Sequence, residues 1–511
     1  MPPATRLTAA ALARRLGPVV DDRGPGAGAT AGPTTGSTGA RPAGYRELAH
    51  RIRGAVLDGR IPVDTGLPSE RDLAAGLAVS RTTVAAAYAL LRDQGWLDSR
   101  RGSGSRLRLP DADAGASRTA AGPAGIFGYR RPDGPELIDL STASLPAAEE
   151  PVMAAVRSAT AALPALLASD GYQPFGLPAL RAVIAERYTA DGVPTTAEQI
   201  LVTNGAQHAF TLAMAELSLP GDRVLIECPT YPVALDAIRA QRRVPEPIGL
   251  VDAGAGGTWD AELLATQLRR SAPRLGYLIP DFQNPTGALM DLPTREHVVS
   301  AARASGTVLV VDESFRDLPF TTTGPLPPRM AALTDDTRVV SLGSVSKSLW
   351  GGLRVGWIRA ARPLVERLAA TRARGDMSGP VLEQLVAAEL LAAPDQALRI
   401  QRERLTRGVL ALRGSLERHV PDWRASRPLG GGFCWIELPG PWASELARLA
   451  PSAGVSIAPG PRFGPDGTME SFLRLPFTQP ADRLDTAVQR LAAIAGRAAA
   501  ARTSVMPGWL A

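Results

Sequence analysis

Residues 341–354 read SLGSVSKSLWGGLR and follow the apolar run Arg338-Val-Val. An apolar run that ends in a Gly/Ser-rich turn is typical of a buried strand whose carboxyl end carries a ligand site. Lys347 is the single lysine of the chain, and the other 55 basic residues are arginines. Only lysine can lose its proton and attack a carbonyl group. We therefore expect Lys347 to perform lysine-specific chemistry. The alternative is a lysine left by chance in an arginine-favouring composition.

Six apolar runs alternate with long Ala/Leu/Arg segments between residues 136 and 500. Nearly continuous apolar strands between helices indicate an α/β fold with a buried, mostly parallel sheet. The predicted strands are Ile200–Thr203, Arg223–Glu227, Gly276–Pro280, Thr307–Val311, Arg338–Ser341 and Leu353–Ile358.

Polar residues follow these runs, where ligands of such sheets bind. Gly205, Ala206 and Gln207 open a helix after the first run, and a helix N-terminus of this kind favours a phosphate. Tyr231 stands between two prolines, which suits stacking on a flat ring, although a structural aromatic residue is the simpler reading. Asn284, in the corner Gln283-Asn-Pro-Thr-Gly287, can bond a phenolic oxygen, and Asp312 ends a buried run where it needs a partner such as a protonated ring nitrogen.

The quoted segment supplies the remaining groups. Ser344, Ser346 and Arg354 suit a phosphate, and Lys347 suits an aldehyde. A phosphate, a pyridinium, a phenolate and an aldehyde together describe pyridoxal 5′-phosphate (PLP). The four histidines are scattered without metal-ligand spacing, so no metal site is expected.

Residues 44–109 have a different character. An apolar stripe over 45–57 predicts a first helix, Ser69 and Ser80 are N-cap candidates for two more, and two short apolar runs flank the basic turn Arg100–Ser105. Three helices and a hairpin of this length predict a winged helix-turn-helix. Twelve arginines and seven acidic residues give 41–110 a net charge of +5, nearly the +6 of the whole chain. This balance favours double-stranded DNA as a partner, with a solvated basic face as the alternative.

The 511 residues, 45% of them apolar, allow at least two domains. Two cysteines exclude a disulfide scaffold, and the absence of a long apolar run argues against a membrane span or a secretory signal, so the cytoplasm is the expected compartment. The expected organisation is a flexible leader (1–43, with a possible short helix over 7–16), a winged-helix domain (44–109), a linker (110–135), a PLP-binding domain (136–500) and a tail (501–511).

Several motifs then resemble known families jointly. Residues 44–109 resemble the GntR-type winged helix through Leu67-Pro-Ser-Glu-Arg71, Val79-Ser-Arg-Thr-Thr-Val84 and Arg101-Gly-Ser-Gly104. Residues 136–500 resemble the fold-type I aminotransferases through Asn284-Pro-Thr-Gly287 and Ser344-Val-Ser-Lys347. Their fusion in this order resembles the MocR family of transcription regulators.

The resemblance implies specific roles. Lys347 would form the Schiff base, Asp312 would pair with the pyridine nitrogen, Asn284 with the phenolic oxygen, and Tyr231 would stack on the ring. The implied phosphate ligands are Gly205, Ala206, Gln207, Ser344, Ser346, Arg354 and, from a neighbouring subunit of a homodimer, Tyr172. Arg474 would bind the α-carboxylate of a small amino compound. The implied DNA-contacting residues are Arg71, Ser80, Arg81, Thr82, Thr83, Arg101, Gly102 and Ser103.

One position departs from the family. A tyrosine is expected two or three residues after Asp312, but the sequence reads Asp312-Glu-Ser-Phe315, which leaves Ser314 as the candidate substitute. The predicted function is a PLP-dependent regulator that senses an amino compound and controls DNA binding. Two rivals stay open: an active aminotransferase that carries a DNA-binding module, and a DNA-binding protein whose large domain serves only dimerisation.

Overall fold

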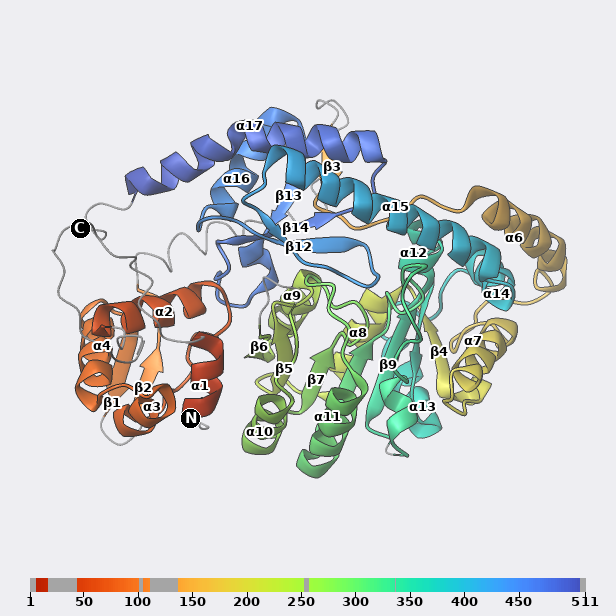
Figure 1. Ribbon diagram of the computed structural model, residues 1–511. Helices are drawn as coiled ribbons and strands as arrows, with labels where there is room; N and C mark the ends of the chain where they lie inside the picture. The colour runs from red at the N-terminus through yellow and green to blue at the C-terminus, as the bar shows by residue number, and fades with distance from the viewer. Residues whose placement is uncertain are drawn as a thin grey trace. The chain divides into compact units, whose positions relative to one another are not determined.

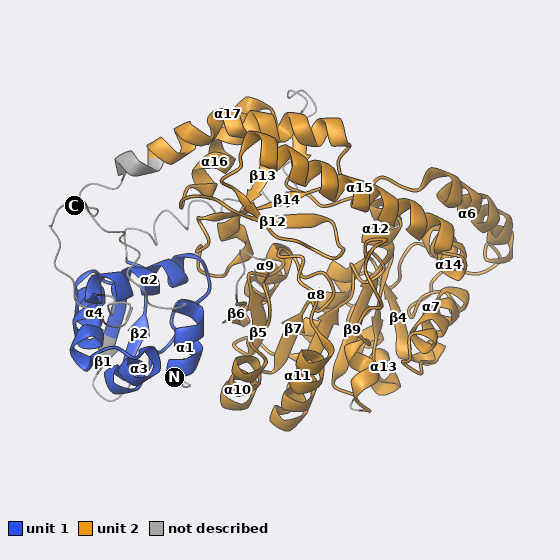
Figure 2. Cartoon of the chain, in the orientation of Figure 1, with its two compact units in different colours: residues 1–119 blue, residues 120–511 orange. Residues whose placement is uncertain are grey.

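The computed structural model describes residues 6–16, 44–100, 104–110, 137–251, 257–335 and 337–505. Within these ranges the chain divides into two compact units, residues 1–119 and 120–511 (Figure 2). Residues 111–135 of the predicted linker and most of the predicted leader and tail lie outside the described residues, as do Arg101, Gly102 and Ser103.

Unit 1 contains the predicted winged helix-turn-helix. Ser69 and Ser80 cap their helices by accepting hydrogen bonds from the backbone N–H groups of Asp72 (3.1 Å) and Thr83 (3.0 Å). The hairpin strands pair antiparallel, and Leu97 faces Leu107 in the register. The elements are α1 (Ala9–Leu16), α2 (Tyr45–Leu57), α3 (Glu70–Leu77), α4 (Arg81–Asp93), β1 (Leu97–Arg100) and β2 (Gly104–Leu107).

The N-terminal segment differs from the expectation of a peripheral leader. Residues 6–16 do contain the expected short helix, but α1 packs against α3 and α2 as part of unit 1. Leu7, Leu12 and Leu16 are buried, because one face of α1 is apolar enough to join the core.

Unit 2 is an α/β structure with a seven-stranded sheet of order β4-β10-β9-β8-β7-β5-β6 (Figure 1). Only β10 runs antiparallel to its neighbours, so the prediction of a mostly parallel sheet is confirmed. The strands are β4 (Ile200–Thr203), β5 (Arg223–Cys228), β6 (Val244–Gly249), β7 (Leu275–Leu278), β8 (Val308–Asp312), β9 (Val339–Ser344) and β10 (Gly356–Arg359).

Helices α8, α9 and α13 share one apolar core with this sheet, and α10 packs beside α11. Further helices complete the unit. The helices that begin before residue 300 are α6 (Glu149–Ala162), η1 (Leu163–Ala165), α7 (Pro178–Ala190), η2 (Ala197–Gln199), α8 (Ala206–Leu217), α9 (Pro232–Ala240), α10 (Ala261–Ser271) and α11 (Leu292–Ser305). The later ones are η4 (Met330–Leu333), α12 (Val345–Ser348), η5 (Gly351–Leu353), α13 (Arg362–Arg372), α14 (Val381–Ala392) and α15 (Asp395–His419).

A second, five-stranded sheet of order β11-β12-β14-β13-β3 shares a separate core with α15, α16 and α17. Its strand β3 comes from the beginning of unit 2 and pairs parallel with β13, more than 300 residues later in the chain. The elements are β3 (Ile138–Leu140), β11 (Arg424–Ala425), β12 (Phe433–Glu437), α16 (Ala443–Leu449), η6 (Ala450–Ala453), β13 (Val455–Pro459), η7 (Gly460–Phe463), β14 (Phe472–Pro476) and α17 (Ala481–Val505).

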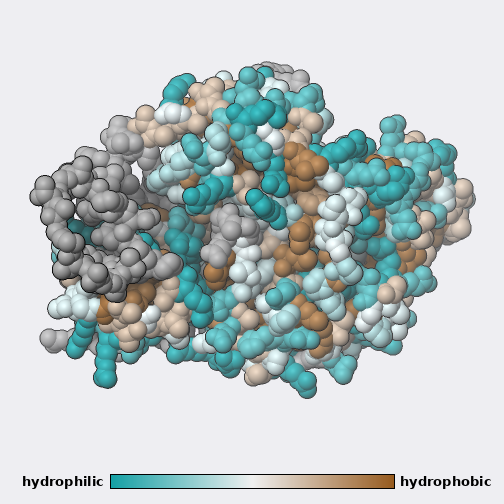
Figure 3. All heavy atoms as spheres, in the orientation of Figure 1, coloured by the Kyte–Doolittle hydropathy of each residue, from teal (hydrophilic) through white to brown (hydrophobic). Residues whose placement is uncertain are grey.

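Hydrophilic side chains cover much of the face shown in Figure 3, with hydrophobic ones between them. Among the described residues, no single helix is long and apolar enough to cross a membrane. Only α3 and α4 taken together reach the necessary length and apolar composition, and they are bent by 120° relative to each other.

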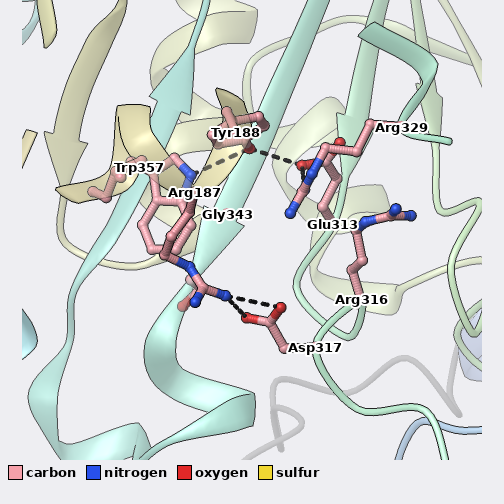
Figure 4. Close-up of a pocket in the computed structure, with 10 residues that line it drawn as sticks. Arg187, Tyr188, Glu313, Arg316, Asp317, Arg329, Gly343 and Trp357 are labelled. Carbon is pink, nitrogen blue, oxygen red and sulfur yellow. Dashed lines mark hydrogen bonds and ion pairs between the residues drawn. The ribbon is translucent and has the colours of Figure 1, made fainter. Parts of the chain in front are cut away.

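Beside Asp312, a polar pocket is filled by paired charges (Figure 4). Glu313 is buried, accepts a hydrogen bond from Tyr188 Oη (2.7 Å) and forms an ion pair with Arg329, which also pairs with Asp191. Arg187 donates two bonds to Asp317 (3.1 Å each). These donors and acceptors satisfy one another. We therefore infer that the pocket residues form a structural network that fixes the turn after β8.

We predict that Arg329→Met lowers the free energy of unfolding of unit 2 by about 3–5 kcal/mol, because it leaves the Glu313 carboxylate buried without its cation. Calorimetry of the full chain measures the shift of the transition. The control is Arg362→Met, which removes an exposed i,i+4 pair with Glu366 and should leave the transition unchanged. Equal shifts in both variants would contradict this account.

Candidate functional site

The carboxyl edge of the large sheet brings the predicted site residues together. Lys347 interacts electrostatically with Asp312, Arg354 and Arg474, and Tyr231 interacts with the same three residues. Asn284 accepts a hydrogen bond from Arg474 Nη1 (3.1 Å). Side chains from separated parts of the chain therefore come close to one another at this edge of the sheet.

The Lys347 side chain is half-buried, and its amine is held inside the site. Its Nζ donates a hydrogen bond to the backbone oxygen of Ala143 (2.9 Å) and lies 5.8 Å from the centre of the Phe315 ring. Burial, and then the positive charge of Arg474, lower the pKa of Lys347 to about 8, against the opposing effect of Asp312. At neutral pH a larger fraction of this amine is therefore neutral, and nucleophilic, than in an ordinary exposed lysine.

Asp312 is fixed at both carboxylate oxygens. Oδ2 accepts a hydrogen bond from the Tyr277 hydroxyl (2.7 Å), and Oδ1 accepts one from the backbone N–H of Ser314 (2.9 Å). Burial, and then the charge of Asp312, raise the pKa of Tyr277, so this phenol stays a donor. Phe315 packs edge-on against Phe433 (5.1 Å) beside the Lys347 amine, so an aromatic ring without a hydroxyl stands there.

A cradle for an anion lies where α8 begins. Gly205 has φ of 82°, a conformation that favours glycine, and a Cβ there would stand 3.3 Å from Arg354 Nη2. Arg354 also donates to the backbone oxygen of Asn204 (3.2 Å). The absence of a side chain at Gly205 thus keeps the space beside the guanidinium and the α8 N-terminus, which includes Ala206 and Gln207.

Two of the four serines in residues 341–354, Ser344 and Ser346, lie at the start of α12. Ser344 Oγ accepts a bond from the Ser346 backbone N–H (3.1 Å) and donates to Val355 O (3.2 Å). Within the described residues, Ser346 Oγ is buried without a hydrogen-bond partner. A buried hydroxyl of this kind is free to bind a ligand oxygen.

Arg474 projects from β14 into the site between two aromatic rings. Its guanidinium carbon lies 5.4 Å from the centre of the Phe433 ring and 5.1 Å from that of Phe463. It also bonds Asn284 and the backbone oxygen of Ser141, while its Nε is buried without a partner in the described part of the chain. Burial lowers the pKa of Arg474 to about 10, so it remains a cation that a carboxylate can pair with.

Glu227 and Gln283, which the sequence did not indicate as site residues, connect two turns of the site. The buried Glu227 carboxylate accepts hydrogen bonds from Trp259 Nε1 (2.9 Å) and Gln283 Nε2 (3.1 Å). Gln283 also donates to the backbone oxygen of Pro229 (2.7 Å), which connects the turn carrying Tyr231 to the turn carrying Asn284. Burial raises the pKa of Glu227 to about 7. The sequence features that could have pointed to these two residues are an acidic residue inside an apolar run, Glu227, and a glutamine inside the Pro/Gly corner, Gln283.

Tyr172 does not join the site within this chain, since its side chain is 56% exposed on the loop before α7. Leu167 on the same loop and Met153 on α6 are exposed as well.

In unit 1, five of the eight DNA-contacting candidates are among the described residues: Arg71 lies in the first turn of α3, and Ser80 to Thr83 lie at the beginning of α4. Arg71, Ser80, Arg81 and Thr82 are exposed and Thr83 is half-buried. The Ser80 hydroxyl is within hydrogen-bond distance of the hydroxyls of Thr82 (3.0 Å) and Thr83 (2.8 Å). These polar groups lie on the first turn of α4, the helix that enters the major groove in a helix-turn-helix.

Comparison with known proteins places both units. Residues 135–491 match the model of aminotransferase class I and II. The chain belongs to this family. Residues 44–107 match the model of bacterial regulatory proteins of the gntR family. A gntR-type unit followed by an aminotransferase unit is the architecture of the MocR family.

Among its relatives, 2-aminoadipate transaminase of Thermus thermophilus is 35% identical over 322 residues, 60% of this chain and 75% of the relative. The probable rhizopine catabolism regulatory protein MocR of Rhizobium meliloti is 28% identical over 399 residues, 74% of this chain and 78% of the relative. The structure of LysN, an α-aminoadipate aminotransferase of Thermus thermophilus complexed with N-(5′-phosphopyridoxyl)-L-leucine, superposes with a TM-score of 0.64 at 30% identity, covering 78% of this chain and all of that one. Membership of this family implies dependence on PLP.

We predict that Lys347 of the PLP-free protein reacts with acetic anhydride with a midpoint near pH 8, because its amine is removed from water beside cations. Competitive labelling followed by peptide mass spectrometry separates this amine from the chain's other amine, the N-terminus. Arg474→Met should move the Lys347 midpoint to higher pH and leave that of the N-terminus unchanged. A midpoint near the ordinary 10.5 in the wild type would contradict the burial argument.

Proposed function

We propose that the protein is a PLP-dependent transcription regulator, in which the aminotransferase unit binds an amino compound and thereby controls DNA binding by the winged helix. The observation that carries this proposal is a single lysine, buried with a lowered pKa among aminotransferase-type site residues, in the same chain as a gntR-type DNA-binding unit.

The site residues fit the cofactor. The cradle of Gly205, Arg354 and the unpaired Ser346 hydroxyl, together with Ala206, Gln207 and Ser344, would hold the phosphate. Asp312 would face the ring nitrogen, Asn284 the phenolic oxygen and Tyr231 the ring face, with Lys347 placed to attack the aldehyde. When bound, PLP supplies an electrophilic aldehyde that amino compounds can compete for. Burial, and then the charge of Asp312, raise the pKa of Tyr231 to about 12, so its hydroxyl stays protonated.

A short segment connects this chemistry to the start of unit 2. Lys347 Nζ bonds Ala143 O, and Arg474 bonds Ser141 O, so one stretch after β3 is held by two site residues. Covalent use of the Lys347 amine would break the first contact, and a carboxylate on Arg474 would compete with the second. Because β3 follows directly after the predicted linker to the winged helix, we infer that ligand binding is transmitted through residues 138–143.

We further propose a homodimer. The exposed Tyr172, Leu167 and Met153 would be covered by a second copy, and Tyr172 would then reach the phosphate site of that copy.

In the DNA-binding unit, Arg81 would read a base in the major groove, and Arg71 would contact a base or a phosphate. We predict that Arg81→Ala weakens binding to a duplex selected from a random pool by roughly 10- to 100-fold, as expected for the loss of one bidentate base contact. Fluorescence anisotropy on the selected duplex and on a random-sequence duplex measures both affinities. Equal losses on the two duplexes would contradict base reading.

The same assay tests regulation. Adding PLP and a mixture of amino acids should change the affinity of the wild type for the selected duplex and leave that of Lys347→Ala unchanged.

An active aminotransferase is the second candidate, favoured by the presence of Asn284, Asp312, Lys347 and Arg474 together. A turnover assay with pairs of amino acids and keto acids separates the two functions. Sustained product formation, with DNA affinity indifferent to those substrates, would favour the enzyme.

A further inference from the structure

The N-terminal segment of unit 1 lies outside residues 44–107, which match the gntR family, and it brings an arginine beside strand β2. Arg6 forms a parallel β-bridge with Gly66, which in turn bridges Arg106 of β2. Leu7 N–H donates to Gly66 O (2.9 Å), and Leu67 N–H donates to Ser105 O (2.9 Å). The segment before α1 therefore extends the small sheet that carries the wing.

Helix α1 fixes this segment in place. Arg15 Nε donates to Arg60 O (2.9 Å), and Arg60 Nη1 donates back to Arg15 O (2.6 Å). A Cβ on Gly76 of α3 would stand 3.0 Å from the Ala9 Cβ, so the two helices are in close contact. Together with the buried Leu12, these contacts make residues 6–16 an ordered part of the DNA-binding unit.

Arg6 is exposed, and its guanidinium lies beside the first residue of β2. Its Nε donates to Leu67 O (3.3 Å), and its Nη2 lies 3.3 Å from where a Cβ of Gly104 would be. Gly104 begins β2 immediately after the wing residues 101–103.

The same guanidinium is close to the helix-turn-helix. Tyr88 of α4 donates its hydroxyl to Pro68 O (3.1 Å), just before the Ser69 cap of α3. Burial and Glu70 raise the pKa of Tyr88, and the charge of Arg6 opposes them. Arg6 therefore lies between the start of β2 and the segment Leu67–Pro68 that leads into α3, on which Arg71 is exposed.

We propose that Arg6 binds a backbone phosphate of duplex DNA beside strand β2, which makes the N-terminal segment part of the DNA-binding surface. This inference rests on the proposed DNA-binding function. A guanidinium held by its Nε suits a phosphate, because an ordered arginine loses less conformational freedom on binding than one on a mobile arm. A phosphate contact also predicts an effect that is independent of DNA sequence.

The test is the salt dependence of binding to a fluorescein-labelled random-sequence duplex, measured by anisotropy with the full chain. Arg6→Met keeps the apolar stem of the side chain and removes the charge. It should weaken binding several-fold and reduce the slope of log affinity against log salt by about 1 per bound chain. Arg6→Lys should retain most of the slope, which separates the charge from a merely structural role.

Arg14→Met is the matched control, because Arg14 is also exposed on this segment but lies in the last turn of α1. It should leave the slope unchanged, and thermal unfolding should confirm that each variant is folded. If Arg6→Met binds like the wild type while Arg81→Ala loses affinity for its selected duplex, the Arg6 contact is wrong and the DNA-binding function stands. If Arg6→Met and Arg14→Met lose the same affinity and slope, the effect comes from net charge in general, and the proposed contact of Arg6 with a phosphate is wrong. If the wild type binds neither duplex, the proposed function itself falls.

Discussion

The buried amine of Lys347 is the constraint around which unit 2 is arranged. An amine removed from water beside two guanidinium groups favours its neutral form, and Asp312 limits that effect. These charges can act on one atom only if the carboxyl ends of separate strands lie close together. In a parallel sheet the carboxyl ends lie at the same edge. In a chain whose other basic residues are all arginines, this one position holds a side chain that can become a nucleophile.

The same site is mechanically tied to its surroundings. Glu227 and Gln283 join the turns of Tyr231 and Asn284, while Lys347 and Arg474 hold the backbone after β3. A ligand controls a switch only if it binds one arrangement of the chain more tightly than another. A ligand that takes the place of a structural contact meets this requirement, because it binds only when that contact is broken. This coupling distinguishes the proposed regulator from a unit that only dimerises.

Much of this could be predicted from local sequence signals. Six strands of the seven-stranded sheet and its ligand-binding edge were predicted from apolar runs, but β6 (Val244–Gly249) was not. Ser69 and Ser80 marked helix starts. Strand burial and capping can be predicted in this way because they act over a few residues. The second sheet escaped prediction, since β3 pairs with β13 across most of the chain. Tyr277 and Glu227 escaped for a related reason: a polar side chain inside an apolar strand acquires meaning only from neighbours on other strands. Helix α1 was read as peripheral because its burial depends on α3 and Gly76, far along the sequence.

The most direct test of this account is to add PLP to the purified protein, reduce with borohydride and map the product by peptide mass spectrometry. The account predicts one phosphopyridoxyl group per chain, on Lys347, and none in Lys347→Ala. A group found on the N-terminal amine instead, or no adduct in the wild type, would contradict it.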